Sequence, residues 1–138
     1  MILGIDPGER RIGIAVADLE TRLARPVEVI DSREVDPFQR IAVLVRELEA
    51  TEIVVGRPVN LAGEEGPAVE AQQAFVSALR AAVDVNVEEY DERMTSVVAD
   101  RALRDIGTRR DRRKELRDAL AAQVMLQGYL DARNPQTR

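Results

Sequence analysis

The hydrophobic period of this sequence changes at Asp36-Pro37, and that change limits the chain to folds that mix strands with helices. Before it, three short β-rich segments are separated by turn residues, a pattern typical of consecutive antiparallel strands. Pro26 lacks a backbone donor and favours a sheet edge or a bulge. We place the three strands at 2–6, 11–18 and 23–31.

After Asp36 the apolar residues recur at helical spacing, behind an Asp N-cap and a Pro at the first helical position. We expect helices at about 37–50, 67–82, 95–106 and 113–132, strands at 52–56 and from Val83 toward Glu92, a loop at 57–66 and a flexible segment at 107–112. This order predicts one α/β domain over residues 1–138. Its mixed five-stranded sheet combines a three-strand antiparallel meander with two parallel strands, and helices cover both faces.

Composition restricts the chemistry, because the chain contains neither cysteine nor histidine. Catalysis would therefore run on carboxylates, hydroxyls, arginines and the single lysine. A metal site built only from carboxylates prefers hard cations such as magnesium, manganese or calcium. No apolar run approaches the roughly 20 residues of a membrane span and no leader precedes Ile2, so we expect a soluble, cytoplasmic protein without a membrane partner.

Acidic residues stand at three positions that the predicted topology brings toward one edge of the sheet. Asp6 ends the first strand, Asp91 and Glu92 end the fifth, and Asp118 lies near the start of the last helix. Each also has a structural interpretation, as a turn former or as an acid at a helix N-terminus. Clustered acids repel one another, and a divalent cation relieves that repulsion. Two cations about 4 Å apart can activate water and stabilise the leaving oxygen of a phosphodiester.

An ordered set of motifs across nearly the whole chain resembles the YqgF/RuvX family. The motifs are Gly4-Ile5-Asp6-Pro7-Gly8 with Arg11-Ile12-Gly13-Ile14-Ala15-Val16-Ala17-Asp18, Val55-Gly56-Arg57-Pro58 with Asn60 and Gly63, Asp91-Glu92-Arg93-Met94-Thr95-Ser96, and Asp118-Ala119-Leu120-Ala121-Ala122. The resemblance implies a ribonuclease H-like fold akin to the resolvase RuvC. It also implies a nuclease that matures the 5′ end of pre-16S ribosomal RNA.

By the same resemblance Asp6, Glu92 and Asp118 are the catalytic residues and hold Mg²⁺ or Mn²⁺. Either Asp91 or Glu92 can face the site, and we prefer Glu92. The positions expected to bind substrate are Asn60, Arg93, Thr95, Arg109, Arg110, Arg112, Arg113 and Lys114. The last five fall in residues 101–117, where eight basic residues stand against three acidic ones in a chain of net charge -5. A solvated, salt-bridged helix face is the alternative interpretation of this segment, and so is a turn for Asn60 and a helix cap for Thr95.

Several alternatives remain open at this point. The substrate is an RNA precursor of 16S rRNA or branched DNA, as for a Holliday-junction resolvase, because no short motif reads the 2′-hydroxyl. The chain can also be a nucleic-acid-binding module without catalysis. An actin-like ATPase relative shares the Gly-Ile-Asp hairpin, but 138 residues leave room for only one of its two lobes. The protein is expected to be a monomer or a homodimer.

Overall fold

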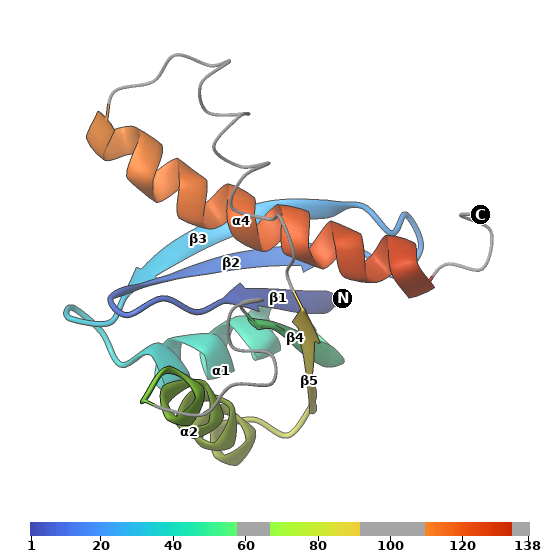
Figure 1. Cartoon of the computed structure of the whole chain (residues 1–138). Helices are drawn as coiled ribbons and strands as arrows, with labels where there is room; N and C mark the ends of the chain where they lie inside the picture. Colours follow the sequence, from blue (N-terminus) through green and yellow to red (C-terminus); the bar gives the residue numbers. More distant parts are fainter. Residues whose placement is uncertain (58–66, 92–109, 134–138) are drawn as a thin grey trace.

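A mixed five-stranded sheet in the order β3-β2-β1-β4-β5 forms the centre of the described chain (Figure 1). The computed structural model describes residues 1–57, 67–91 and 110–133, with side chains in the last range from residue 118 onward. β1, β2 and β3 form an antiparallel meander, while β4 and β5 run parallel to β1, so the predicted sheet is confirmed. The strands are β1 (Ile2–Asp6), β2 (Arg11–Ala17), β3 (Ala24–Asp31), β4 (Glu52–Arg57) and β5 (Asn86–Asp91).

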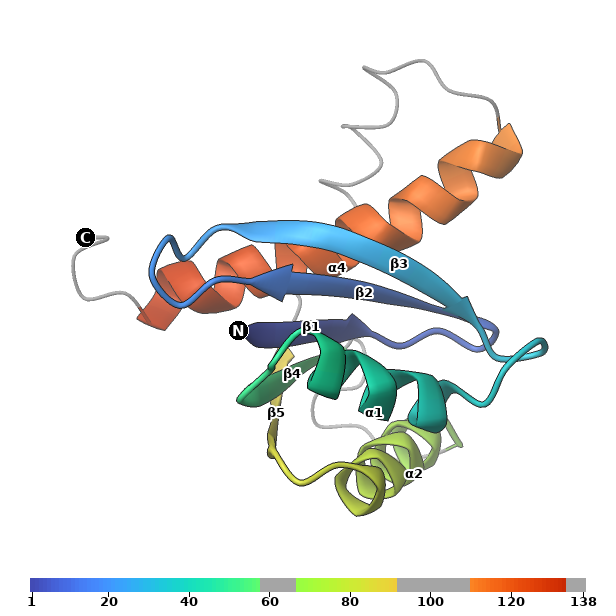
Figure 2. The ribbon, with the colours of Figure 1, turned by 180° about the vertical axis from the view of Figure 1, so that it is seen from behind.

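Helices cover both faces of this sheet (Figures 1 and 2). α1 (Pro37–Glu47) and α2 (Pro67–Ala82) make the two crossovers between parallel strands and lie on one face, and α4 (Arg110–Arg133) crosses the other. α1 begins as predicted, because the Asp36 side chain accepts a hydrogen bond of 3.0 Å from the Phe38 N–H. No helix in the described ranges combines the length and apolarity needed to cross a membrane.

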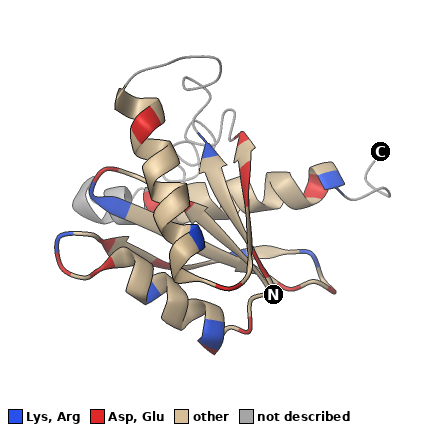
Figure 3. Ribbon diagram, turned by 90° about the horizontal axis from the view of Figure 1, so that it is seen from below, with Lys and Arg blue, Asp and Glu red and all other residues tan. Residues whose placement is uncertain are grey.

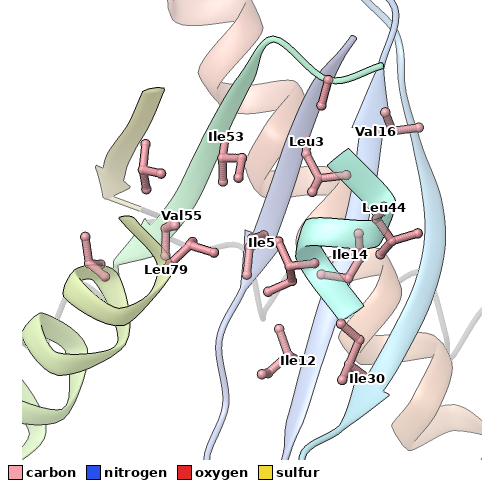
Figure 4. Close-up of a cluster of buried hydrophobic side chains, with 14 residues drawn as sticks. Leu3, Ile5, Ile12, Ile14, Val16, Ile30, Leu44, Ile53, Val55 and Leu79 are labelled. Carbon is pink, nitrogen blue, oxygen red and sulfur yellow. The ribbon is translucent and has the colours of Figure 1, made fainter. Parts of the chain in front are cut away.

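The larger of two apolar clusters lies between the sheet and the helix pair α1 and α2 (Figure 4). Alternate residues of each strand point to this side, as the two-residue period of a strand requires. Leu3 and Ile5 of β1 are fully buried here. The cluster comprises Leu3, Ile5, Ile12, Ile14, Val16, Ile30, Ile41, Leu44, Ala50, Ile53, Val55, Val76, Leu79 and Val87.

The opposite face of the sheet carries small side chains, and α4 packs closely on it. Ala15 and Ala17 of β2 lie under α4, and a methyl group at Gly4 would stand 2.9 Å from the Leu126 Cβ. Small residues let the helix approach the strands to van der Waals contact without a gap. The α4 side of this cluster consists of Ala122, Met125, Leu126, Tyr129 and Leu130.

Polar side chains hold the C-terminal half of α4 to the sheet. Gln127 accepts a hydrogen bond of 2.8 Å from the Ala24 N–H and donates one of 3.0 Å to the Arg22 carbonyl. The Tyr129 hydroxyl donates to Glu88 Oε2 at 2.9 Å, and the Arg133 guanidinium contacts the same oxygen at 3.0 Å. These contacts fix the position of α4 along the strands. The position of its N-terminal half follows, because both halves belong to one continuous helix.

Replacing Tyr129 by Phe is expected to lower the free energy of unfolding by about 1.5 kcal/mol, because a hydrogen bond to a carboxylate is lost while the ring remains packed. Burial and then the bond to Glu88 raise the pKa of the Tyr129 phenol above its ordinary value near 10. The stabilisation is therefore complete below about pH 10 and is lost as pH rises further, since the unfolded chain releases the proton first. Urea unfolding at pH 8 and 10.5 measures both effects, and an equal pH dependence in Tyr129→Phe would contradict the assignment.

Three element boundaries differ from the predictions. α1 ends at Glu47 rather than near residue 50, because the Leu48 N–H closes the helix on Leu44 and Glu49 adopts a left-handed φ of 53°. β5 begins at Asn86 rather than Val83, whose N–H still bonds to the last turn of α2. α4 begins at residue 110, so the prediction of a flexible segment over 107–112 is wrong from there on; arginine is a strong helix former.

Pro26 has both of its predicted consequences. β3 is the edge strand of the sheet, and the register of β2 against β3 passes from Ile14 opposite Glu28 to Ala15 opposite Pro26, which leaves Val27 as a bulge. The fourth strand was expected to end at residue 56, before a loop at 57–66, but Arg57 still belongs to β4 because it pairs with Asp91. The rest of that loop and the helix expected at 95–106 lie outside the described residues.

Candidate active site

One edge of the sheet collects the carboxyl ends of the three parallel strands. Asp6 ends β1, Arg57 ends β4 and Asp91 ends β5. Arg57 and Asp91 are register partners across the last two strands. Asp6 and Asp91, the two strand-end acids that the structure describes, therefore lie at the same end of the sheet.

Asp6 and Asp118 lie on the same face at this edge. Along β1, Ile2 and Gly4 face α4, and strand alternation gives Asp6 the same side. Asp118 stands one helical turn before Ala122, which packs on the sheet, and its side chain is half-buried. The structure thus brings together two of the three predicted acids from positions 112 residues apart in the sequence.

Gly13 lies between these two acids, with Asp6 on the neighbouring strand and the Asp118 backbone on α4. It is the register partner of Asp6 on the neighbouring strand, and a side chain at Gly13 would collide with the backbone carbonyl oxygen of Asp118. The backbone of α4 therefore rests directly on β2 beside Asp6. A glycine inside a strand is typical of a close approach by another backbone, and here that backbone belongs to α4.

Asp91 lies on the opposite face of the sheet. Glu89, two residues earlier on β5, accepts a hydrogen bond of 3.2 Å from Gln72 of α2, and alternation assigns Asp91 to that same side. Gln72 is buried and also donates to the Gly56 carbonyl at 3.2 Å. Asp91 is therefore directed away from the face that carries Asp6 and Asp118.

The other predicted site residues fall outside the described part of the structure. This holds for Glu92, Asn60, Arg93, Thr95 and Arg109. The backbone of the remaining basic candidates forms the first turns of α4, which project past the sheet on the side of Asp118 (Figure 1), but their side chains are outside the described residues. These four are Arg110, Arg112, Arg113 and Lys114.

The donor groups on the α4 face fit a hard divalent cation. Asp6 and Asp118 offer carboxylate oxygens, and the chain has no imidazole or thiol that would favour zinc or copper. Among the described residues, no three acids stand close enough to form a complete ligand group.

The sequence interpretation did not identify two further features of this edge. Arg11 opens β2 on the α4 face, and only the alternation of β2 with Gly13 marks it. On the other face, Arg57, Gln72 and Glu89 line a small pocket between α2 and the sheet. A buried glutamine between two strand ends leaves no local sequence signal, since its partners come from β4 and β5.

Charged residues in the described part of the chain are spread over several elements, as Figure 3 shows. In contrast to the block of basic residues at 101–117, the described part of the sheet presents no single basic face. Near the site, Asp31 at the end of β3 accepts hydrogen bonds from Arg10 and from the Arg33 N–H. The Arg33 backbone bond and the Arg10 guanidinium hold the pKa of Asp31 below its usual value.

Comparison with known proteins gives consistent matches along the chain. A family model described as "RuvX: Holliday junction resolvase" matches residues 1–132. A relative from Chloroflexus aggregans is 46% identical over 97% of this chain and 96% of its own length. A relative from Anaeromyxobacter dehalogenans strain 2CP-C is 45% identical over 96% of this chain and 98% of its own. Both carry the name "Putative pre-16S rRNA nuclease".

Several solved structures with similar folds are resolvases. RuvC of T. thermophilus in complex with a Holliday junction substrate has a TM-score of 0.56 at 21% identity, covering 96% of this chain and 94% of that one. The fowlpox virus resolvase in complex with its Holliday junction substrate has a TM-score of 0.55 at 12% identity, covering 95% and 97%. RuvC-like resolvases have a ribonuclease H-like fold, so the predicted fold class is confirmed.

Proposed function

This chain belongs to the RuvX family, and on that basis we propose that it is a divalent-metal-dependent nuclease that matures the 5′ end of pre-16S rRNA. The observation that carries the proposal is that Gly13 adjoins both acids, because it pairs with Asp6 across the sheet and the Asp118 backbone rests against it. Two carboxylates from opposite ends of the chain converge on one face, beside the edge where strands end. Two acids on one face of the sheet are better explained by a shared hydrolytic site than by separate roles in a turn and at a helix N-terminus.

Asp6 and Asp118 would hold Mg²⁺ or Mn²⁺, with Glu92 as the third acidic ligand. Asp91 faces α2, and this supports Glu92 as the acid of that pair that serves the site. The bound cation would supply an activated water and neutralise charge on the phosphodiester. The two carboxylates would position the cation. The close contact of the α4 backbone with Gly13 holds Asp118 on the face of Asp6.

The remaining candidates would bind the nucleic acid. Asn60, Arg93 and Thr95 are proposed to contact substrate near the third acid. Arg109, Arg110, Arg112, Arg113 and Lys114 are proposed to contact phosphates from the N-terminal turns of α4 and the residue before them. Binding that depends on these cations should weaken steeply with added salt.

A cleavage panel tests the function directly. The purified chain is incubated with Mg²⁺ or Mn²⁺ and three substrates: RNA carrying the precursor 5′ end of 16S rRNA, unstructured RNA of equal length, and a four-way DNA junction. We expect metal-dependent cleavage that is fastest on the rRNA precursor. Preferential cleavage of the junction would favour the resolvase alternative, and binding without any cleavage would favour the non-catalytic module.

A further inference from the structure

Arg11 stands next to the acid pair but has no part in the function proposed above. It is the first residue of β2, two residues before Gly13, and strand alternation places it on the α4 face with Gly13. Two strand residues span roughly 7 Å. The backbone carbonyl of Arg11 is packed against Gly8, which belongs to the turn that follows Asp6. The Arg11 side chain therefore begins at the same end of the sheet as Asp6.

One nitrogen of Arg11 is a buried donor that has no acceptor within residues 1–57, 67–91 and 118–133. Among the residues that the structure describes, no hydrogen-bond partner lies within reach of its Nη1, which is shielded from solvent. A buried cationic donor without an acceptor is costly, so such groups are normally paired. An acceptor brought by a ligand would remove that cost.

The carboxylate opposite Arg11 on β3, that of Asp31, already has other partners. Asp31 is the register partner of Arg11, but Arg10 contacts it through Nε at 3.3 Å and through Nη2 at 3.2 Å. The Arg33 N–H adds a hydrogen bond of 2.9 Å to the same side chain. Arg10 thus occupies Asp31, and Arg11 keeps a buried donor that this carboxylate does not satisfy.

We propose that Arg11 binds a backbone phosphate of the nucleic-acid substrate adjacent to the phosphate that is cleaved. A guanidinium presents a planar pair of donors that matches phosphate oxygens, and the contact is independent of sequence. This inference rests on the proposed nuclease function. It adds a phosphate contact on β2 that is separate from the basic segment 101–117.

The test measures binding in the cleavage-deficient Asp6→Asn background, so that affinity is read without turnover. Single-stranded RNA is titrated at several salt concentrations against Arg11→Gln and against Arg25→Gln, an exposed arginine of β3 outside the site. We expect Arg11→Gln to bind about ten-fold more weakly and to reduce the salt slope by about 0.7, the value for one phosphate contact on a single strand. Arg25→Gln should keep the slope of the parent.

Arg11→Lys is the second variant, and it keeps the proposal testable if Arg11→Gln does not fold. It retains the charge and loses the planar fork, so the salt slope should stay while the affinity falls several-fold. Parent-like affinity in both Arg11 variants, or equal losses in Arg11→Gln and Arg25→Gln, would overturn the proposal. Those results would leave the nuclease function standing. Cleavage that survives Asp6→Asn would instead contradict the proposed function, and the same titrations without divalent cation would then read the affinity of Arg11→Gln without turnover.

Discussion

Asp6→Asn is expected to lower the rate of metal-dependent cleavage at least about a hundred-fold without unfolding the chain. Losing one carboxylate removes part of the charge that holds the cation, and cation stabilisation of a phosphodiester transition state contributes several kcal/mol. Asp118→Asn should have a similar effect, because both acids lie on the α4 face at the same sheet edge. Single-turnover cleavage of the rRNA precursor measures the loss.

Asp84→Asn is the matched control for these variants. Asp84 is exposed in the loop before β5, at the opposite edge of the sheet, and the substitution changes the net charge equally. The same assay separates Asp91 from the acid that follows it in the sequence: Glu92→Gln should cleave poorly, whereas Asp91→Asn, on the face of α2, should retain turnover. Full activity in Asp6→Asn or Asp118→Asn would refute the assignment of the site.

Cation binding offers a readout that does not depend on turnover. A ligand that binds only the folded chain raises its stability, by about 2.7 kcal/mol at a hundred times its dissociation constant. Manganese should therefore raise the melting temperature of the wild-type chain and of Asp84→Asn. The increase should be largely absent in Asp6→Asn and Asp118→Asn.

Gly13→Ala is expected to reduce cleavage about a hundred-fold although no acid is changed. The new methyl group would meet the Asp118 backbone carbonyl, so α4 must move away from β2 and carry Asp118 with it. A displacement of about 1 Å in a catalytic group is enough for a loss of this size. Overpacking should also lower the free energy of unfolding by about 1–3 kcal/mol.

Gly128→Ala separates this effect from a general sensitivity of glycines that face the sheet. A methyl group at Gly128 would lie 3.6 Å from the Tyr90 hydroxyl, an ordinary contact, and alanine favours the helix by up to about 1 kcal/mol. Its cleavage rate should match the wild type while its stability stays equal or rises. Urea unfolding beside the kinetics shows whether the activity lost in Gly13→Ala exceeds its unfolded fraction, and wild-type cleavage by Gly13→Ala would contradict the role of Gly13.

Local chemistry accounts for what the sequence predicted well. The Asp36 cap, the turn after Asp6 and the bulge at Pro26 depend on residues within a few positions of each other, so they can be recognised without the fold. Strand and helix periods likewise led to the mixed sheet. The helix boundary at residue 110 was missed because a polar, charged stretch has no apolar period to mark where a helix begins.

The candidate site was only partly predictable. The acids were named from motifs and strand ends, but their faces follow from register and packing between distant segments. That Asp118 reaches Asp6 depends on α4 docking against Gly13, and that Asp91 faces away depends on the alternation of β5 against α2. Whether Asp31 pairs with Arg10 or with Arg11 was likewise decided in three dimensions.

The sequence by itself determined the elements, their order and the residue types available for catalysis, because periodicity, turn chemistry and composition are properties of neighbouring residues or of the whole list. Only the tertiary structure decided which acids share a face and which arginine keeps a buried donor. These relations require a helix near the end of the chain to rest on a strand near its beginning. That contact depends on the combined packing of both faces of the sheet, which no local segment encodes.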